Sequence, residues 1–249
     1  MMRRILGVIP ARLESTRLPG KPLRAICGRP MIAWVYENAR PAACLDHLLV
    51  ATDSPEVESY CRQHGIPAMM TSRAHKSGTD RLAEVMAKEP AAIYVNIQGD
   101  EPMITPDHLE RLLRPFSEAP ATQVSTLKVA IDAQTALDRN VVKVVTDLAG
   151  RALYFSRARI PFDRDGTGPG QYFKHQGFYA FSAAALQTFH HLPASPLEKL
   201  EKLEQLRFLE NGIDIAVVET PHDTIGVDSE EDLRRVEEYF QRWRSPGGR

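Results

Sequence analysis

The sequence has few cysteines, almost no charge imbalance and no long apolar run. Its three cysteines, Cys27, Cys44 and Cys61, are odd in number and follow no zinc-binding spacing. We therefore expect thiols in a reducing compartment rather than a disulfide framework or a structural metal. The 31 basic and 32 acidic residues give a net charge of −1, which offers no support for non-specific nucleic-acid binding or a membrane-surface role.

The N-terminal apolar run is also too limited to act as a targeting signal. It covers only Ile5 to Ile9 and continues directly into Pro10 and Arg12. No segment approaches the length of a membrane span, and no G-x-G-x-x-G follows the first run, which disfavours a dinucleotide-binding dehydrogenase. These absences predict a cytoplasmic protein whose partners are neither nucleic acid nor membrane.

Short apolar runs and amphipathic segments alternate over the first half of the chain. The runs are typical of buried parallel strands, and we expect them at Ile5–Ile9, Asp46–Thr52 and Ala92–Ile97. Amphipathic patterns predict helices at Met31–Ala39, Pro55–His64, Asp80–Met86 and Pro106–Leu113. This order predicts an α/β fold with a doubly wound, mostly parallel sheet.

The second half is less regular. We expect strands at Gln123–Ala130, Val141–Asp147, Phe178–Phe181 and Ile213–Val218. Helices are expected at Leu197–Asn211, where leucines recur at every third position, and at Asp228–Trp243, with a flexible loop at 166–170 and a frayed tail at 245–249. Because no long linker or internal repeat separates the halves, we expect one domain over 1–249 whose second half extends the same sheet.

The polar loops after the predicted strands indicate where a ligand binds. Ligands of doubly wound sheets bind beyond the carboxyl ends of the strands. Loops 11–21, 71–80 and 98–102 follow such ends, so we expect them to meet in one crevice.

The loop PARLESTRLPGKP combines cations with small residues. Arg12, Arg17 and Lys21 alternate with Ser15, Thr16 and Gly20. The planar guanidinium of arginine and the mobile ammonium of lysine both bind phosphate oxygens well. Small residues let backbone N–H groups approach the same oxygens. The loop lacks a Walker ending. On these residues alone, a triphosphate site and a solvated basic loop are both possible interpretations.

Two aspartates are candidate ligands for Mg²⁺, which takes a few hard oxygens together with substrate phosphates. Asp100 follows the strand predicted at 92–97, and Asp228 precedes the predicted terminal helix. The alternatives are a turn or N-cap aspartate at Asp100 and a helix N-terminus at Asp228.

The motifs of the chain, taken together, resemble those of one enzyme family. The opening loop resembles the signature of sugar nucleotidylyltransferases and, in detail, of 3-deoxy-manno-octulosonate (KDO) cytidylyltransferases. Further matching segments follow in order across essentially the whole chain: ATD at 51–53, SGTDRLAE at 77–84, NIQGDEP at 96–102, LYFSRARIPFDRD at 153–165, KHQGFYAF at 174–181, LEKLEQLR at 200–207 and GVDSEEDL at 226–233.

The resemblance implies a homodimeric enzyme that makes CMP-KDO from CTP and KDO with Mg²⁺, for lipopolysaccharide biosynthesis. It implies a CTP-binding half at about 1–120 and a sugar-binding and dimerisation half at about 121–249. Lys21 and Arg12 would contact the triphosphate beside Ala11, and Asp100 and Asp228 would hold the metal; these four charged residues are the implied catalytic set. The nucleotide site would also include Ser77, Gly78, Thr79, Arg81 and Gln98. As a bare pattern, residues 77–81 indicate only a capped helix start.

The sugar acid needs partners for a carboxylate and several hydroxyls. The resemblance implies Gln98, Arg157, Arg164, His175, Tyr179, Glu204 and Gln205. Without it, His175 would be interpreted as a surface histidine and Tyr179 as a core aromatic. Glu204 and Gln205 would be neighbours on the predicted helix, where adjacent side chains point in different directions.

Three alternatives remain open from the sequence. The sugar acid could be the 8-amino analogue of KDO, which the sugar-side residues do not distinguish. A CMP-sialic acid synthetase shares the opening loop, although LYFSRARIP and EKLEQLR favour the octulosonate branch. A nucleotide-binding module without catalysis is the third; the presence of Lys21, Asp100 and Asp228 argues against it.

Overall fold

The protein is described by a computed structural model that covers residues 4–13, 17–75, 77–166 and 171–244. Ser15 and Thr16 of the opening loop, most of the predicted loop at 166–170 and the predicted tail at 245–249 lie outside the described residues. The chain forms two compact units: Met1–Leu109 together with Thr224–Arg249, here called unit 1, and Glu110–Asp223, here called unit 2. The C-terminal segment that carries Asp228 therefore belongs with the first half of the chain.

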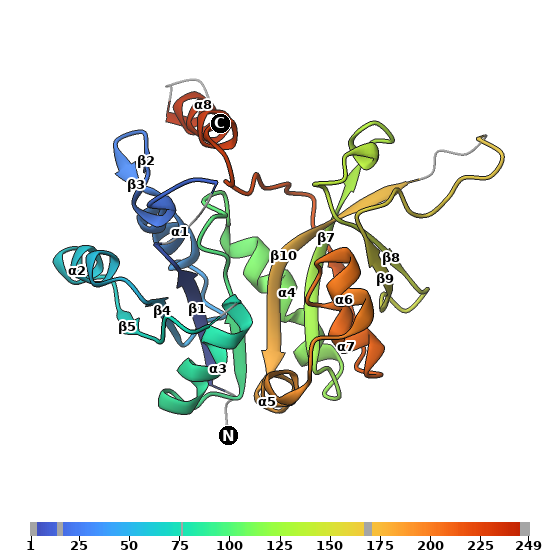
Figure 1. Ribbon diagram of the computed structural model, residues 1–249, viewed down its shortest axis with the longest axis horizontal. Helices are drawn as coiled ribbons and strands as arrows, with labels where there is room; N and C mark the ends of the chain where they lie inside the picture. The colour runs from blue at the N-terminus through green and yellow to red at the C-terminus, as the bar shows by residue number, and fades with distance from the viewer. Residues whose placement is uncertain (1–3, 14–16, 76, 167–170, 245–249) are drawn as a thin grey trace. The chain divides into compact units, whose positions relative to one another are not determined.

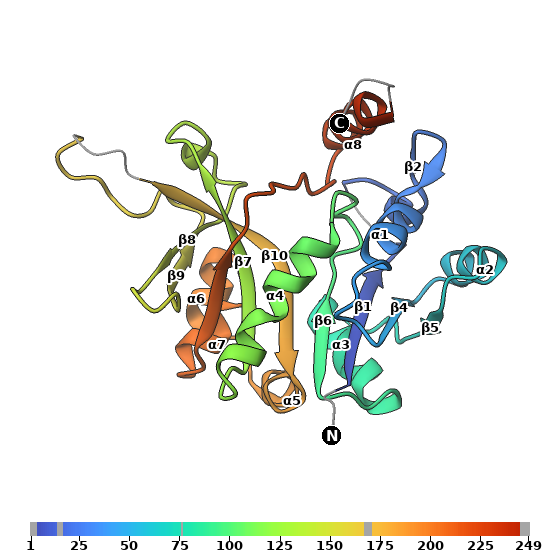
Figure 2. The same ribbon diagram turned by 180° about the vertical axis from the view of Figure 1, so that it is seen from behind.

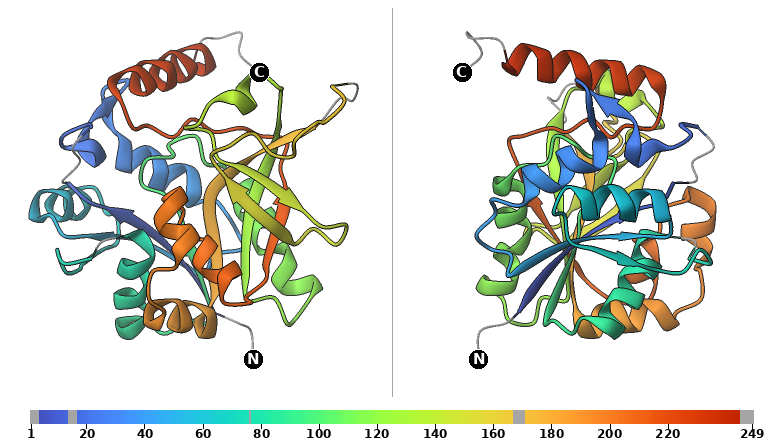
Figure 3. Two further views of the ribbon diagram at one scale, coloured as in Figure 1. Left: turned by 45° about the vertical axis from the view of Figure 1, so that its right-hand side comes forward. Right: turned by 90° about the vertical axis from the view of Figure 1, so that its left-hand side faces the viewer.

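Unit 1 contains a parallel sheet in the order β6-β1-β4-β5. Its strands are β1 (Ile5–Ala11), β4 (His47–Thr52), β5 (Ala68–Met70) and β6 (Ile93–Asn96). The helices are α1 (Met31–Ala39), α2 (Pro55–Gln63), α3 (Gly78–Lys88) and α8 (Glu230–Arg244), with a short 3₁₀ turn η1 (Lys21–Leu23) and a hairpin of β2 (Ala25–Ile26) and β3 (Arg29–Pro30). Figure 1 labels these helices and the strands other than β6, Figure 2 labels β6, and Figure 3 shows α1 and α2 on one face of the strands and α3 on the other. The predicted doubly wound, mostly parallel arrangement is confirmed.

The parallel sheet places the predicted loops together. β1 pairs with β4 from Leu6 to Ala11 and with β6 from Ile5 to Val8, and its residues are almost continuously buried. Since all four strands run the same way, their carboxyl ends lie at one edge. Gly99 shows how close the loops come there: a Cβ on it would lie 2.5 Å from the carbonyl oxygen of Pro10, so only glycine fits.

Helix α8 is held on unit 1 by an apolar cluster of its own. The cluster joins Leu18 of the opening loop, Trp34 of α1 and Val227, Val236 and Phe240 of the C-terminal segment. The Trp34 and Phe240 rings stack with centroids 4.3 Å apart. Arg24 adds two hydrogen bonds to Glu230, of 2.6 and 2.9 Å. The packing ties the C-terminal segment to the opening loop.

Unit 2 contains antiparallel pairing and an aromatic core. Its strands are β7 (Val124–Ile131), β8 (Lys143–Thr146), β9 (Ala152–Ser156), β10 (Tyr172–Ser182) and β11 (Ile215–Glu219). The shorter elements are η2 (Thr135–Leu137), α5 (Ala183–His191), α6 (Pro196–Glu201) and α7 (Leu206–Glu210), while α4 (Pro106–Glu118) continues in from unit 1. β7 pairs with β10 antiparallel and with β11 parallel, and Figure 2 shows β7 and β10 side by side. Phe155, Phe178, Phe181, Phe189 and Phe208 are buried in this unit.

The prediction of a single helix at Leu197–Asn211 is wrong. The chain forms α6 and α7 instead, and Lys202 between them takes a left-handed conformation with φ of 56°. A spacing of three residues advances about 60° short of a full turn, so leucines placed at every third position do not share one helix face. Leu200 is accordingly 79% exposed whereas Leu206 is fully buried. The strand predicted at Phe178–Phe181 is the end of the longer β10, and β5, β9 and α5 were not predicted.

Candidate nucleotide-binding site

The three loops that were predicted to share a crevice line one cavity of unit 1. Its volume is about 490 Å³. The lining residues include Ala11, Arg12, Arg17, Lys21, Gly78, Gln98, Gly99, Asp100 and Asp228. Seven of the predicted nucleotide and metal residues therefore lie around the same space, together with Arg17, which belongs to the same loop but was not among the residues that the resemblance implied.

Lys21 lies between the two predicted metal ligands. Its Nζ atom is 2.5 Å from Asp100 Oδ2 and 2.8 Å from Asp228 Oδ1. Arg17 contacts the second oxygen of Asp228 at 2.9 Å. The structure thus brings cations of the opening loop together with carboxylates from two distant segments, and it gathers two cations and two anions within direct contact.

The local backbone explains why these groups meet. Gly20 adopts a left-handed conformation with φ of 67°, which starts the 3₁₀ turn that carries Lys21. The N–H of Val227 donates to the carbonyl of Asp100 at 2.8 Å, so the two aspartate segments are joined through their backbones. The sequence could not reveal this last contact, because 127 positions separate the two residues it joins.

Asp228 does not act as the N-cap of helix α8. Ser229 Oγ accepts from the N–H of Asp232 at 3.2 Å, and the carboxylate of Asp232 accepts from the N–H of Ser229 at 3.0 Å. This reciprocal pair is a capping box. Because Ser229 and Asp232 satisfy the helix end, the Asp228 carboxylate is left to face Lys21 and Arg17.

The charges shift the pKa values of the paired groups. Partial burial raises the pKa of Asp228, but hydrogen bonds and charge from Lys21 and Arg17 outweigh burial and leave that pKa below its ordinary value. Burial works against the charged form of Lys21, yet the two carboxylates outweigh it and hold the pKa of Lys21 above its ordinary value. Both groups are therefore charged at neutral pH.

The turn at residues 77–81 is both a helix start and part of the cavity wall. Ser77 caps α3 with a capping box formed with Asp80, so the structural interpretation of the pattern holds. Gly78 lines the cavity, whereas Thr79 is buried in the first turn. Arg81 is fully buried and does not line the cavity; it pairs with Asp53 at 2.6 Å. The structure therefore places Arg81 behind the site rather than in it.

Unit 2 holds the remaining predicted sugar residues, and they fall into different environments. Tyr179 and Gln205 are buried, and the Tyr179 hydroxyl and Gln205 Nε2 have no hydrogen-bond partner among the residues that the structure describes. Burial raises the pKa of Tyr179 well above its ordinary value, the charge of Glu204 adds to this shift, and the nearby Thr126 side chain partly offsets it. The ring of His175 lies 5.4 Å from that of Tyr179. These four residues form a polar group beside the aromatic core.

His175 is a neutral residue of the fold rather than a surface histidine. Its Nε2 lies 2.9 Å from Thr126 Oγ1, and its ring meets the edge of Phe155 at 5.0 Å. Burial, with the nearby charge of Lys174, lowers the pKa of His175 to about 3. The imidazole therefore carries no charge near neutral pH, and it can both donate and accept a hydrogen bond.

The two predicted arginines of unit 2 differ from one another. Arg157 donates to the carbonyls of Glu201 and Arg139, at 2.9 and 3.2 Å, so its guanidinium is held by the protein. Arg164 is exposed. Of the two arginines, Arg164 is the one whose guanidinium is accessible to a carboxylate ligand.

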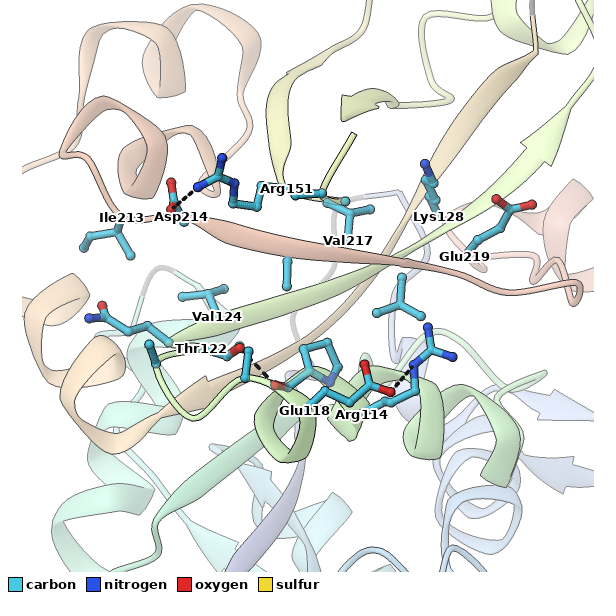
Figure 4. Close-up of a pocket in the computed structure, with 18 of the residues that line it drawn as sticks. Arg114, Glu118, Thr122, Val124, Lys128, Arg151, Ile213, Asp214, Val217 and Glu219 are labelled. Carbon is cyan, nitrogen blue, oxygen red and sulfur yellow. Dashed lines mark hydrogen bonds and ion pairs between the residues drawn. The ribbon is translucent and has the colours of Figure 1, made fainter. Parts of the chain in front are cut away.

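Unit 2 also contains a larger cavity, of about 950 Å³, that includes none of the predicted site residues. It lies between α4 and β11, and Figure 4 shows its charged lining. Arg114 pairs with Glu118 at 3.6 Å and Arg151 with Asp214 at 3.5 Å, so much of its charge is matched internally. Cavity size alone therefore does not identify the functional site. The smaller cavity of unit 1 is the one lined by the predicted nucleotide and metal residues.

Comparisons with known proteins agree with this geometry. The model of the family described as Cytidylyltransferase matches residues 6–215. A 3-deoxy-manno-octulosonate cytidylyltransferase of Acidobacterium capsulatum is 57% identical over 94% of this chain and 95% of its own, and one of Koribacter versatilis is 53% identical over 95% and 90%. A solved CMP:2-keto-3-deoxy-manno-octonic acid synthetase in complex with CTP superposes with a TM-score of 0.92 at 46% identity, covering 96% of this chain and 98% of its own. The chain belongs to the cytidylyltransferase family.

Proposed function

We propose that this chain transfers CMP from CTP to the anomeric hydroxyl of KDO, giving CMP-KDO and pyrophosphate. The observation that carries the proposal is the position of Lys21 between Asp100 and Asp228, in a cavity that Arg12 and Arg17 also line. Relatives about half identical over nearly the whole chain are named for this activity, and a similar solved protein binds CTP.

The reaction is an attack of the sugar hydroxyl on the α-phosphorus, with pyrophosphate as the leaving group. Catalysis of such transfers rests on positioning and charge stabilisation. Lys21 and Arg12 bind the phosphates and stabilise the charge that develops on the leaving pyrophosphate. Gly78 and Gln98 lie on the same cavity, where backbone and amide groups supply hydrogen bonds to the base and ribose.

Asp100 and Asp228 fit a site for Mg²⁺. Both supply hard carboxylate oxygens, and both already contact one cation, the Lys21 ammonium. Among the residues that the structure describes, no cluster of three acidic, histidine or cysteine side chains occurs; two carboxylates suffice because Mg²⁺ completes its shell with phosphates and water. When bound, Mg²⁺ would neutralise phosphate charge and polarise the P–O bonds, which makes the α-phosphorus more open to attack.

The sugar acid is assigned to the polar residues of unit 2. Arg164 supplies an exposed fork for the carboxylate, and Tyr179, Gln205 and His175 supply hydrogen-bonding groups for hydroxyls. The unpartnered hydroxyl of Tyr179 and amide of Gln205 support this, because buried polar groups are nearly always satisfied by a partner.

The setting of the reaction is also part of the proposal. The product would feed lipopolysaccharide biosynthesis in the cytoplasm, and the three cysteines are thiols, as a reducing compartment requires. No described helix has the length and apolar character needed to cross a membrane. A homodimer is proposed because Leu148, Leu153 and Leu200 of unit 2 expose large apolar side chains.

Pyrophosphate release from CTP tests the function. KDO, its 8-amino analogue and sialic acid are compared as acceptors, with Mg²⁺ and with excess EDTA. We expect release with KDO that requires Mg²⁺ and that falls at least about a hundredfold in Asp100→Asn. Faster pyrophosphate release with the 8-amino analogue than with KDO would make the analogue the assigned substrate. CTP binding without pyrophosphate release would contradict the proposed activity.

A further inference from the structure

A chain of buried hydrogen bonds links the carboxyl ends of three strands in unit 1 to helix α3. Thr52 Oγ1 donates to the carbonyl of Ala11 at 2.7 Å. Thr71 Oγ1 donates to the carbonyl of Thr52 at 3.0 Å and accepts from Arg81 Nη1. Thr52 and Arg81 are fully buried and Thr71 nearly so. The chain therefore spans the ends of β1, β4 and β5.

Arg81 joins this chain to a carboxylate. Its Nη2 donates to Asp53 Oδ2 at 2.6 Å, and its Nη1 also reaches the carbonyl of Ser72 at 3.4 Å. An ionised side chain is buried only when it is paired. The planar guanidinium contacts Asp53 and Thr71 at the same time, which the single ammonium of a lysine on its flexible stem would do poorly.

One end of this hydrogen-bond chain lies in the wall of the nucleotide cavity, and the other end lies one helical turn from that wall. Ala11 lines the cavity directly, and so does Gly78, which lies one helical turn before Arg81 on α3. A Cβ on Gly78 would lie 3.4 Å from Pro10 Cγ, so the turn already packs against the end of β1. A change in the position of Arg81 would therefore alter the spacing between two walls of the cavity.

We infer that Arg81 and Asp53 are positioning residues for nucleotide recognition, which act through Thr71 and Thr52 without touching the nucleotide. Backbone groups recognise a base only if their spacing is held to within about half an ångström. The role gives a function to the ATD segment at 51–53 and replaces the predicted contact of Arg81 with the nucleotide. The inference rests on the proposed function, since it assumes that this cavity binds CTP.

Binding of CTP to the full-length protein, measured by calorimetry with Mg²⁺, tests the inference. Thr71→Val keeps the side-chain volume but removes the hydroxyl that connects Arg81 to Thr52. Arg81→Lys keeps the positive charge but removes the planar guanidinium that contacts Asp53 and Thr71 together. We expect the CTP dissociation constant to rise about tenfold in Thr71→Val, the effect of one lost hydrogen bond, and further in Arg81→Lys. The KM for the sugar acid should not change.

Arg207→Lys is the matched control. Arg207 pairs with Glu198 in unit 2 at 2.5 Å, and the two side chains are 14% and 13% exposed, against 0% and 14% for Arg81 and Asp53, so this pair is also largely buried. We expect this variant to lower Tm as Arg81→Lys does and to leave CTP binding unchanged. Equal losses of Tm with unchanged CTP binding in all three variants would overturn the inference, and Thr71→Val decides it if Arg81→Lys does not fold.

The outcomes for the two proposals are separable. An unaltered protein that binds CTP but releases no pyrophosphate contradicts the proposed function, while the CTP dissociation constants of the variants still decide the positioning role. An unaltered protein that does not bind CTP overturns both.

Discussion

The charged residues that line the nucleotide cavity of unit 1 and the buried polar candidates of unit 2 differ in how completely the protein satisfies them. In the nucleotide cavity, Lys21 is ion-paired with Asp100 and Asp228, and a backbone hydrogen bond joins the two aspartate segments. On the sugar side, the Tyr179 hydroxyl and Gln205 Nε2 are buried without a partner among the described residues. The comparison teaches that the carboxylates of the nucleotide cavity are already paired with cations of the protein, whereas polar groups in unit 2 still have hydrogen bonds to make.

Replacing Lys21 by Met should produce the largest effect, because it removes the cation that both carboxylates contact. We expect kcat to fall by about two to three orders of magnitude, the cost of removing one charge-stabilising donor. Pyrophosphate release at saturating CTP and sugar acid measures it. Lys88→Met is the control, since Lys88 also pairs with a carboxylate of unit 1 but lies on the exposed side of α3. A fall in kcat of less than tenfold in Lys21→Met would contradict the claim that the paired charges around Lys21 serve catalysis.

The nucleotide side could be predicted from sequence more fully than the sugar side. Lys21 and Asp100 follow β1 and β6, which the sequence predicts as parallel strands, and the topology of such a sheet brings the segments after its strands to one edge. Gly78 begins α3 after β5, a strand that was not predicted. The contact between Val227 and Asp100, and the burial of Arg81, depend on tertiary packing that no local pattern encodes.

The sugar side depends on irregular structure. The break at Lys202 separates Glu204 and Gln205 from α6, and no Gly or Pro marks its position. The leucines at every third position favoured a continuous helix, but α6 and α7 pack different faces and bury Leu206 while Leu200 is exposed. The resemblance could name residues there, but the sequence could not tell that His175 would be held neutral beside Phe155.

Tyr179→Phe sharpens the comparison by removing one open polar group. We expect the KM for the sugar acid to rise about tenfold, the value of one hydrogen bond, with KM for CTP unchanged. Stability should stay equal or rise by about 1 kcal/mol, because a buried hydroxyl without a partner is removed. Steady-state kinetics and urea unfolding measure the two effects. A variant with unchanged sugar KM and lower stability would show that the hydroxyl has a structural partner.

Acid should weaken both units by the same mechanism, and this is the smallest expected effect. Burial raises the pKa of Glu84, but Lys88, the Ser72 N–H and His75 outweigh it and lower that pKa to about 2. The pKa of Glu198 is likewise lowered, because Arg207 outweighs burial. Since a folded pKa below the unfolded value of about 4.3 favours the folded state only when the group is ionised, each contribution is present above about pH 4.3. The Glu84 contribution is lost as pH falls toward about 2.

Urea unfolding of Glu84→Gln and Glu198→Gln against the unaltered protein measures these contributions. We expect each variant to be about 1–2 kcal/mol less stable at pH 6, the scale of hydrogen bonds to a charged group, and the difference to shrink below about pH 4.3. Glu84 holds the segment that leads into Gly78, so Glu84→Gln should also raise KM for CTP, whereas Glu198→Gln should not. A difference that grows as the solution is acidified would contradict the sign. Equal CTP kinetics in both variants would mean that the loop before Gly78 holds its place without Glu84.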